Sequence, residues 1–509
     1  MTAAPILHSH QGDLRGVRVG DVIQFRGVPY AAPAEGDLRF RGPQPLTPWS
    51  GERDATDWGA MSPQPTGSSM SLKTVRPQLY DATFGESYGQ RQGEDCLTLH
   101  VWAPAETPAP ARPVMVWVHG GAFDHGTSAT LRTDGSALAS THGVVMVSIT
   151  HRLGALGFAA FGDLDDAGVT TPNAGLLDIV AGLHWVQENI AAVGGDPDNV
   201  TLFGESGGGT KIASLLGMPL SEGLFHRAIL QSTPLDGLST REETTDAAAL
   251  LAAELGIARS DSLVADLQRV PVAAIVQAQH ELVESGRLRS MSFAPTVDGV
   301  VLTETPYEAL TRGRGARMPI LMGIDEREIA SFSSADTSLD GLDDAGLSTR
   351  AREYLGVDGD ALIAAYRSAD PDLTPRDVWV RIISDRALTL ALVDVGRART
   401  DAATADTFQY LFTWVSPAWP EIGSFHGSEA AFVFDTVAHV PLAVADPEAQ
   451  SIADVVSAAW VSFARTGEPG WPEHRSDAAV YALPPVATLL SDPFGPIRDA
   501  WRRTLDGSS

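Results

Sequence analysis

Strand-like apolar runs alternate with helix-like segments through the first half of this 509-residue chain. V-M-V-W-V (114–118) and V-V-M-V-S-I-T (144–150) are continuously apolar, as expected of central strands that are covered on both faces. Apolar residues recur at helical spacing over 176–190, and G-G-D-P-D-N (194–199) predicts a turn before the strand V-T-L-F-G (200–204). This alternation predicts an α/β fold with a mostly parallel central sheet flanked by helices.

The rest of the chain continues this pattern and interrupts it twice. Three further apolar runs predict strands: 226–232, 319–323 and 408–414. Between about 233 and 318, and again from 334 to 397, the pattern is mostly helical and acidic. No Pro/Gly/Ser-rich linker separates two independently patterned halves. We therefore expect one domain over 1–509, with two inserted helical segments over the active site.

The charge balance excludes several classes of partner. Asp and Glu number 64 against 36 Lys and Arg, which gives a formal net charge of −28. Nucleic acids and anionic membrane surfaces are bound by basic patches, so this composition argues against both as partners. No apolar run approaches the length of a membrane span, and the first residues lack the pattern of a signal peptide. The single cysteine, Cys96, excludes an intramolecular disulfide. We expect a cytoplasmic protein.

G-E-S-G-G (204–208) matches G-x-S-x-G between a predicted strand and a predicted helix. That context is typical of a nucleophile elbow, in which a sharp turn presents the serine hydroxyl at the top of the sheet. Gly204 and Gly208 would then permit the turn. The alternative is a glycine-rich turn in which Ser206 caps the helix, and it needs no partner residues elsewhere. The catalytic interpretation requires an oxyanion hole, an acid and a histidine, the last two following the serine in that order.

Upstream, H-G-G-A-F (119–123) comes directly after the strand run 114–118. Backbone N–H groups of a glycine loop can be aimed at the carbonyl oxygen that becomes negative during acyl transfer. The alternative is a plain strand-to-loop turn. The presence of two glycine motifs of these kinds in this order favours the oxyanion loop.

His426 stands out among the 13 histidines because F-H-G-S-E (425–429) follows the late strand run 408–414. A histidine on a loop after the last strands can reach Ser206, accept its proton and return it to the leaving group. For the acid, the run 319–323 leads into three carboxylates, Asp325, Glu326 and Glu328. Spacing alone does not choose among them.

These motifs together resemble the type-B carboxylesterases, the cholinesterase-like branch of the α/β-hydrolase fold, along nearly the whole chain. The residues that carry the resemblance are F-R-G-V-P-Y-A-A-P (25–33), L-R-F-R-G-P-Q-P (38–45), G-E-D-C-L-T-L-H-V-W (93–102), H-G-G-A-F-D-H-G (119–126), R-L-G-A-L-G-F (152–158), G-G-D-P-D-N-V-T-L-F-G-E-S-G-G (194–208), F-A-P-T-V-D-G (293–299) and F-H-G-S-E (425–429). The resemblance implies a serine hydrolase that cleaves carboxylic esters of small molecules.

The resemblance also implies which residues form the site. The family's acid, a glutamate five residues after the glycine that ends its strand, falls on Glu328, although the usual next glycine is Ile329 here. The oxyanion donors would be the N–H groups of Gly121, Ala122 and Gly207, the last at a position where alanine is commoner. Around the triad, Glu205 is expected to be buried and Ser232 to support the acid through a hydrogen bond. Structural ion pairs are expected between Arg39 and Glu94 and between Arg152 and Asp178, and Cys96 is expected to be a buried, inert thiol.

The expected reaction is two-step acyl transfer, with Ser206 as nucleophile and His426 as base, and it requires no metal or organic cofactor. Two alternatives are an enzyme that uses the same triad on carbamates or amides, and a non-catalytic binding protein of this fold. Side chains expected to line the pocket, with a plain core role as the alternative for the first two, are Phe123, Phe293, Trp414 and Trp419. A monomer or a small homo-oligomer is expected.

Overall fold

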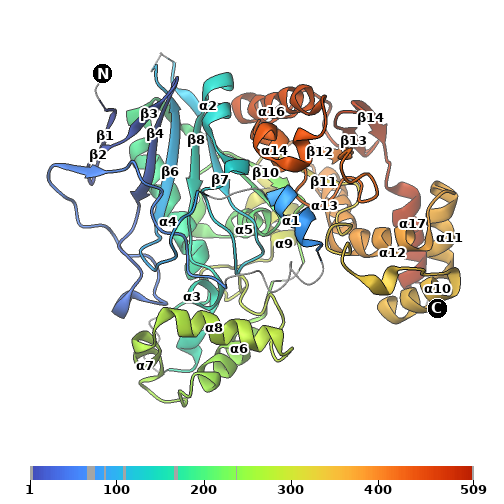
Figure 1. Ribbon diagram of the computed structural model, residues 1–509, viewed down its shortest axis with the longest axis horizontal. Coiled ribbons are helices and arrows are strands. Elements are labelled where there is room, and N and C mark those ends of the chain that lie inside the picture. Colours follow the sequence, from blue (N-terminus) through green and yellow to red (C-terminus); the bar gives the residue numbers. More distant parts are fainter. Residues whose placement is uncertain are drawn as a thin grey trace.

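A large twisted sheet crosses the molecule in the computed structural model, which describes residues 4–65, 75–84, 88–106, 110–165, 170–236 and 238–506 (Figure 1). Within these ranges the sheet has eleven strands in the order β14-β13-β12-β11-β10-β9-β7-β8-β6-β4-β3, and β1, β2 and β5 form a small separate sheet. The strands are β1 Ile6–Ser9, β2 Gly12–Arg15, β3 Val17–Val19, β4 Val22–Pro29, β5 Glu52–Asp54, β6 Thr98–Pro104, β7 Arg112–Val118, β8 Val145–Ile149, β9 Gly195–Glu205, β10 Arg227–Gln231, β11 Ile320–Asp325, β12 Thr407–Phe412, β13 Ala479–Ala482 and β14 Thr488–Ser491.

The central strands, from β8 through β7, β9, β10, β11 and β12 to β13, run parallel, and the strands outside them pair antiparallel. The predicted mostly parallel α/β fold is therefore confirmed, and each run predicted above as a strand overlaps one of these strands, with ends that differ by up to two residues except at the start of β9. The turn predicted over 194–199 is wrong. β9 already begins at Gly195, which pairs with Arg112, and the turn is confined to Gly194 with φ 84°. A Cβ on Gly195 would lie 2.9 Å from Val114, so glycine permits this close approach.

Both faces of the sheet are buried, which explains the continuous apolar runs. Val116 and Val118 of β7 belong to one hydrophobic cluster, whereas Met115 and Trp117 of the same strand belong to another. The first cluster includes residues of α4, α5 and α13, and the second includes residues of α2 and α16. Because successive side chains of a strand point to opposite faces, β7 supplies side chains to both hydrophobic clusters.

The helices are α1 Pro77–Phe84, α2 Ser136–His142, α3 Gly154–Phe158, α4 Ala174–Asn189, α5 Gly207–Leu216, α6 Arg241–Glu254, α7 Leu263–Arg269, α8 Val272–Glu284, α9 Pro306–Thr311, α10 Asp344–Leu355, α11 Asp360–Ala369, α12 Pro375–Ser384, α13 Leu390–Asp401, α14 Ala430–Val433, α15 Pro441–Val444, α16 Ala449–Thr466 and α17 Gly495–Asp506. Among the residues of the ranges given above, no helix is long and apolar enough to cross a membrane.

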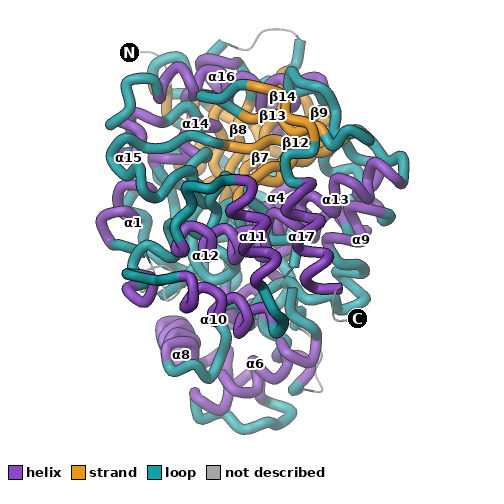
Figure 2. Tube along the Cα trace, turned by 90° about the vertical axis from the view of Figure 1, so that its right-hand side faces the viewer, coloured by secondary structure: helices purple, strands orange, loops and turns teal. Residues whose placement is uncertain are grey.

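The two inserted segments differ in what they pack against. Helices α6, α7 and α8 of the first segment form a group at one end of the molecule, away from the sheet (Figures 1 and 2). Helices α10, α11 and α12 of the second segment pack with the carboxyl-terminal α17, whose Trp501 lies in their shared hydrophobic cluster. Helix α13 covers β12 instead, so the second segment contributes both to this cluster and to the layer over the sheet.

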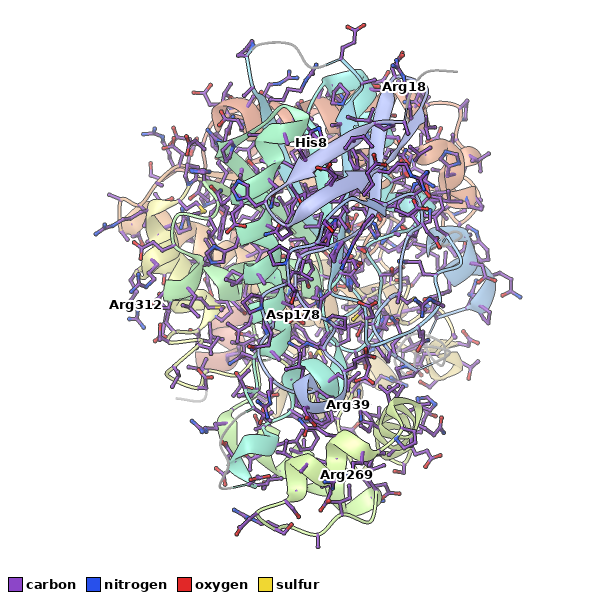
Figure 3. All side chains as sticks on the ribbon, turned by 90° about the vertical axis from the view of Figure 1, so that its left-hand side faces the viewer. His8, Arg18, Arg39, Asp178, Arg269 and Arg312 are labelled. Atoms are coloured by element: carbon purple, nitrogen blue, oxygen red, sulfur yellow. The ribbon has the colours of Figure 1, made fainter. Side chains whose placement is uncertain are left out.

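Two predicted ion pairs are confirmed. Arg39 Nη2 lies 2.6 Å from Glu94 Oε2, and Arg152 Nη2 lies 2.6 Å from Asp178 Oδ1. Arg39 Nη1 also donates to three backbone carbonyls over 267–270 and so ties the amino-terminal part to the first insertion. Figure 3 shows Arg39 close to the helix that carries Arg269.

Asp178→Asn is expected to destabilise the fold by about 3–5 kcal/mol, because it leaves the guanidinium of Arg152 buried without a counter-charge. The midpoint of urea unfolding measures this loss. The matched control is Glu254→Gln, which breaks the more exposed ion pair with Arg287 and should change stability by less than about 1 kcal/mol. Equal effects of the two substitutions would contradict a structural role for the buried pair.

Cys96 is fully buried, and its thiol forms no disulfide. Burial, together with the nearby carboxylate of Asp178, raises the pKa of this thiol to about 12. A thiol that stays protonated in an apolar site is a poor nucleophile. The expectation that Cys96 is buried is confirmed, and its lack of reactivity stays a prediction that the raised pKa supports.

Candidate active site

Four strands near the centre of the sheet lead into the candidate residues. Strands β7, β9, β11 and β12 lead at their carboxyl ends into the loop 119–123, Ser206, Glu328 and the loop of His426, with β10 between β9 and β11. Carboxyl ends of parallel strands meet at one edge of a sheet, where α/β proteins bind their ligands. Topology therefore gathers residues that are up to 307 positions apart, from 119 to 426, at one edge of the sheet.

Ser206 lies at the corner between β9 and α5, with φ 56° and ψ −127°. A positive φ is uncommon for a residue with a Cβ, and strain of this kind is typical of a nucleophile elbow. The hydroxyl makes no capping hydrogen bond with α5, so the alternative of a helix-capping serine is wrong. Ser206 is also partly exposed, whereas Glu205 and Gly207 on either side are buried.

The glycines beside Ser206 provide room rather than unusual dihedrals. A Cβ on Gly208 would lie 2.1 Å from Val118 O, and one on Gly204 would lie 2.7 Å from the same oxygen. Neither glycine has a positive φ. They let the elbow approach the end of β7 closely.

His426 is held between two carboxylates. Its Nδ1 donates to Glu328 Oε2 at 2.6 Å, and its Nε2 lies 3.2 Å from Glu205 Oε1. Burial lowers the pKa of the imidazole, but the carboxylates of Glu205 and Glu328 outweigh burial and raise it to about 9. Over the described ranges the Ser206 hydroxyl has no hydrogen-bond partner. The hydrogen bond between a catalytic serine and its histidine is often long before substrate binds and shortens in the complex.

Of the three competing carboxylates, only Glu328 contacts the imidazole. Glu328 is fully buried, and its other oxygen accepts the backbone N–H of Asp325. Glu326 turns outward to Arg381, with 3.0 Å between Nη2 and Oε1. Ile329, the residue that departs from the resembling family's expected glycine, donates its backbone N–H to Ser384 Oγ at 3.0 Å.

Ser232 does not contact Glu328 as expected. Its hydroxyl instead lies 3.3 Å from Asp325 Oδ2, so that expectation is wrong in its partner. Asp325 also accepts from Ser428 Oγ and from Gly427 N–H, beside the histidine. Burial, with the carboxylates of Glu429 and Glu328 nearby, raises the pKa of Asp325 well above its usual range. Asp325 therefore braces the histidine loop by accepting these hydrogen bonds.

The loop 119–123, which is predicted to form the oxyanion hole, lies against the turn at Ser206. Gly121 and Ala122 have φ 84° and 50°, and a Cβ on Gly207 would lie 2.1 Å from Ala122 O. Within the described part of the chain, the N–H groups of Gly121, Ala122 and Gly207 donate to no protein acceptor. Gly207 is the first residue of α5, where N–H groups have no partner inside the helix. Three unpaired backbone donors thus lie next to Ser206, and they could accept a negatively charged oxygen.

The four predicted pocket residues lie in different surroundings. Phe123 and Phe293 are buried in the first hydrophobic cluster, where Phe123 contacts Phe158. Trp414 is also buried and donates through its indole N–H to Asp446, so its position is that of a core residue and not of a pocket wall. Trp419 is partly exposed at the edge of the second cluster.

A small cavity lies beside the loop 119–123. Its walls include Gln64, Asp124, Leu156 and Gln279 but none of the four predicted pocket residues. No three His, Cys, Asp or Glu side chains among the described residues are arranged to hold a metal ion.

Sequence reasoning missed three side chains near this site. Phe332 packs against the His426 ring at a centroid distance of 5.4 Å, and Glu429 accepts from Gln231 at 3.1 Å on the buried side. Lys211 is fully buried on α5, with its Nζ 3.2 Å from His119 O. A lysine inside the apolar helix G-G-T-K-I-A-S-L-L was the signal that could have marked the last of these.

Comparison with known proteins shows which family the chain belongs to. A family model described as the carboxylesterase family matches residues 3–481. The para-nitrobenzyl esterase of Bacillus subtilis (strain 168) is 33% identical over 96% of this chain and 96% of its own length. Human carboxylesterase 3 is 34% identical over 98% of this chain and 90% of its own.

Solved structures agree with the fold as well. The crystal structure of a Geobacillus stearothermophilus carboxylesterase superposes with a TM-score of 0.83 at 32% identity, covering 97% of this chain and 99% of that one. A para-nitrobenzyl esterase structure covers 98% of this chain and 100% of its own, with a TM-score of 0.81 at 31% identity. The chain therefore belongs to the carboxylesterase family and is a carboxylic ester hydrolase of the α/β-hydrolase fold.

Proposed function

We propose that this carboxylesterase cleaves esters of small molecules through a Ser206–His426–Glu328 triad and an acyl-enzyme intermediate. The observation that carries the proposal is the 2.6 Å hydrogen bond from His426 Nδ1 to Glu328 Oε2, at the sheet edge that also carries Ser206. This bond requires the proton on Nδ1, and it leaves Nε2 of the neutral ring free to accept a proton.

In the first step Ser206 Oγ attacks the ester carbonyl carbon while Nε2 of His426 takes the hydroxyl proton. The carbonyl oxygen becomes negative and accepts hydrogen bonds from the N–H groups of Gly121, Ala122 and Gly207. The tetrahedral adduct then expels the alcohol, which leaves with the proton from Nε2, and Ser206 carries the acyl group. Water repeats the sequence on the acyl-enzyme and releases the acid. Glu328 holds the ring and stabilises the imidazolium in both steps.

Carbamates and amides are the alternative substrates, because the same donors and serine serve any acyl carbonyl. The test is a panel of p-nitrophenyl esters, aryl carbamates and anilides, with the enzyme also treated with an organophosphate that phosphorylates active serines. We expect ester turnover to exceed anilide turnover, and mass spectrometry to locate the phosphoryl group on the peptide that contains Ser206. Labelling of another serine with loss of activity would contradict the proposal.

Glu205→Gln is expected to lower the pH at which activity rises. His426 has a pKa of about 9, and only its neutral form is a base, so kcat/KM should increase with pH toward that value. Removing the negative charge 3.2 Å from Nε2 should lower the apparent pKa by roughly 1–3 units. The measurement is kcat/KM from pH 5 to 10 for both enzymes, and an inflection at the same pH would contradict this coupling.

We further propose that 1–509 form one domain, that the enzyme works in the cytoplasm, and that it is a monomer or a small homo-oligomer. The two hydrophobic clusters that share the sheet support a single domain. Size-exclusion chromatography with light scattering measures the oligomeric state.

A further inference from the structure

A lysine is buried directly beneath the oxyanion loop. Lys211 extends from α5, and its Nζ donates to His119 O at 3.2 Å, with the ring of Phe123 at 5.7 Å. The described residues supply no other hydrogen-bond acceptor to this ammonium group. Burying a lysine costs free energy unless its charge is paired and its N–H groups are hydrogen-bonded. Here its one hydrogen bond ends on the residue that opens the loop 119–123.

The imidazole of His119 contacts the peptide that joins Gly120 to Gly121. His119 Nδ1 donates to Gly120 O at 3.0 Å, since a carbonyl oxygen can only accept. The ring stacks on that of His151, with centroids 4.4 Å apart and an interplanar angle of 5°. Gly126 leaves room for it, because a Cβ at that position would lie 2.6 Å from His119 Nδ1. The ring is therefore held on one face by the stack and at its edge by a hydrogen bond.

Holding a carbonyl oxygen fixes the direction of the N–H group in the same peptide. The peptide unit is planar and trans, so its C=O and N–H point in opposite directions. Gly120 O belongs to the peptide whose N–H is that of Gly121, the first proposed oxyanion donor. His119 Nδ1 thereby turns the Gly121 N–H away from the imidazole.

The other two proposed donors are aimed in the same manner, each with a backbone N–H group holding the carbonyl oxygen. Gly121 O accepts from His125 N–H at 3.2 Å, which orients the N–H of Ala122. Ser206 O accepts from Thr210 N–H at 3.1 Å and from the Thr210 hydroxyl at 3.4 Å, which orients the N–H of Gly207. Of the three donors, the N–H of Gly121 is therefore the one whose peptide is held, among the described residues, by a side chain without a backbone donor.

We propose that His119 and Lys211 act together as positioning residues for the oxyanion hole, and this inference rests on the proposed function. Lys211 anchors the backbone at His119 O, and the imidazole of His119 aims the N–H of Gly121. Neither side chain touches the substrate. Their effect should therefore be largest on the tetrahedral adduct, whose oxygen is negative, and smaller on the bound ester.

The charges around the pair favour a neutral, Nδ1-protonated imidazole. Burial and the nearby Lys211 lower the pKa of His119 to about 3, and burial lowers that of His151 well below its ordinary value. Burial also lowers the pKa of Lys211 to about 7, against the carboxylates of Asp124 and Glu205, which raise it. Protonation of His119 is thus opposed at every pH at which the enzyme works, and its hydrogen bond to Gly120 O persists.

His119→Leu tests the inference, because it removes the Nδ1 donor while it keeps an apolar group of similar width. We expect kcat for p-nitrophenyl acetate to fall by roughly 10-fold to 10²-fold, less than the loss of a donor outright, with KM within about 3-fold of wild type. The Ki of a trifluoromethyl ketone, which forms a tetrahedral adduct with the serine, should rise by the same factor as kcat/KM falls. His119→Asn, whose amide nitrogen can replace Nδ1, should recover most of the lost kcat.

Lys211→Met should lower kcat by about 10-fold, because His119 O loses its anchor but the imidazole stays. The matched control is His100→Leu, a buried histidine whose Nδ1 accepts from Gly27 N–H outside this site. It should reduce stability and leave kcat unchanged. A His119→Leu enzyme with kcat within 3-fold of wild type overturns the inference, as does an Asn variant no better than Leu. Should His119→Leu not fold, an unchanged kcat in Lys211→Met overturns it.

The proposed function fails by a different result, namely ester hydrolysis that persists in Ser206→Ala. Activity in wild type, its loss in Ser206→Ala and unchanged kcat in the His119 variants would leave the triad standing and remove only the positioning role.

Discussion

Ser206→Ala is expected to lower kcat for a short-chain p-nitrophenyl ester by roughly 10⁶-fold, as loss of the nucleophile does in a serine hydrolase of another fold. The hydroxyl makes no hydrogen bond to α5, so its removal breaks no contact with that helix. Alanine keeps the Cβ that already occupies the corner at φ 56°. The variant should therefore unfold at the same temperature as wild type while it fails to release p-nitrophenol.

The matched control is Ser214→Ala, which removes a buried hydroxyl from the same helix. Ser214 Oγ donates to Thr210 O inside α5 and has no contact with the triad. Its kcat should stay within about 3-fold of wild type, as for substitutions away from the reacting groups. Full activity in Ser206→Ala, measured with freshly purified protein, would refute the assignment of the nucleophile.

Glu328→Gln is expected to lower kcat by roughly 10⁴-fold, the cost of the equivalent amide replacement in a serine protease triad. The carboxylate accepts the Nδ1–H of His426 at 2.6 Å and balances the imidazolium that forms when Ser206 is deprotonated. An amide has no charge to balance it, and its NH₂ group can favour the tautomer with the proton on Nε2. Steady-state rates for wild type and variant, compared at the pH optimum of each, measure the loss.

Two neighbouring carboxylates serve as controls. Glu326→Gln removes a charge that pairs with Arg381 near the surface, and its kcat should not change. Asp325→Asn should also be mild compared with Glu328→Gln, because Asp325 accepts from Ser232, Gly427 and Ser428, whereas the imidazole Nδ1 contacts Glu328. A loss of 10⁴-fold in either variant, with Glu328→Gln near wild type, would transfer the acid role to that residue.

Much of the fold could be predicted because its determinants are local. The continuous apolar runs of β7 and β8 and the helical spacing of α4 each arise from a pattern shorter than twenty residues. The G-x-S-x-G turn likewise requires only its own glycines and the strand before it. The wrong prediction of a turn over 194–199 also arose from the use of local sequence alone. The Gly, Asp and Pro residues of this segment are typical of a turn. Gly195, however, pairs with Arg112 of β7, far away in the chain, and residues 196–199 form an irregular stretch of β9 before pairing resumes at Val200.

The acid illustrates what local patterns leave open. Asp325, Glu326 and Glu328 are chemically equivalent in sequence, and only the resemblance to a family favoured Glu328. The direction in which each side chain leaves the turn after β11 decides which of them meets the imidazole. Ser232 was assigned to the acid on the same resemblance, and its actual partner is Asp325.

Lys211 shows most clearly which features the sequence determines and which only the tertiary structure decides. Residue order and hydrophobic pattern were enough to predict the strand–helix alternation and to find the glycine motifs, with candidate carboxylates and His426 following Ser206 in the chain. The tertiary structure alone placed an ammonium group under His119 O and an imidazole against Gly120 O. The reason is physical. Secondary structure follows from interactions between near neighbours in the chain, whereas the aim of a backbone N–H depends on groups that only the packed sheet brings within about 3 Å.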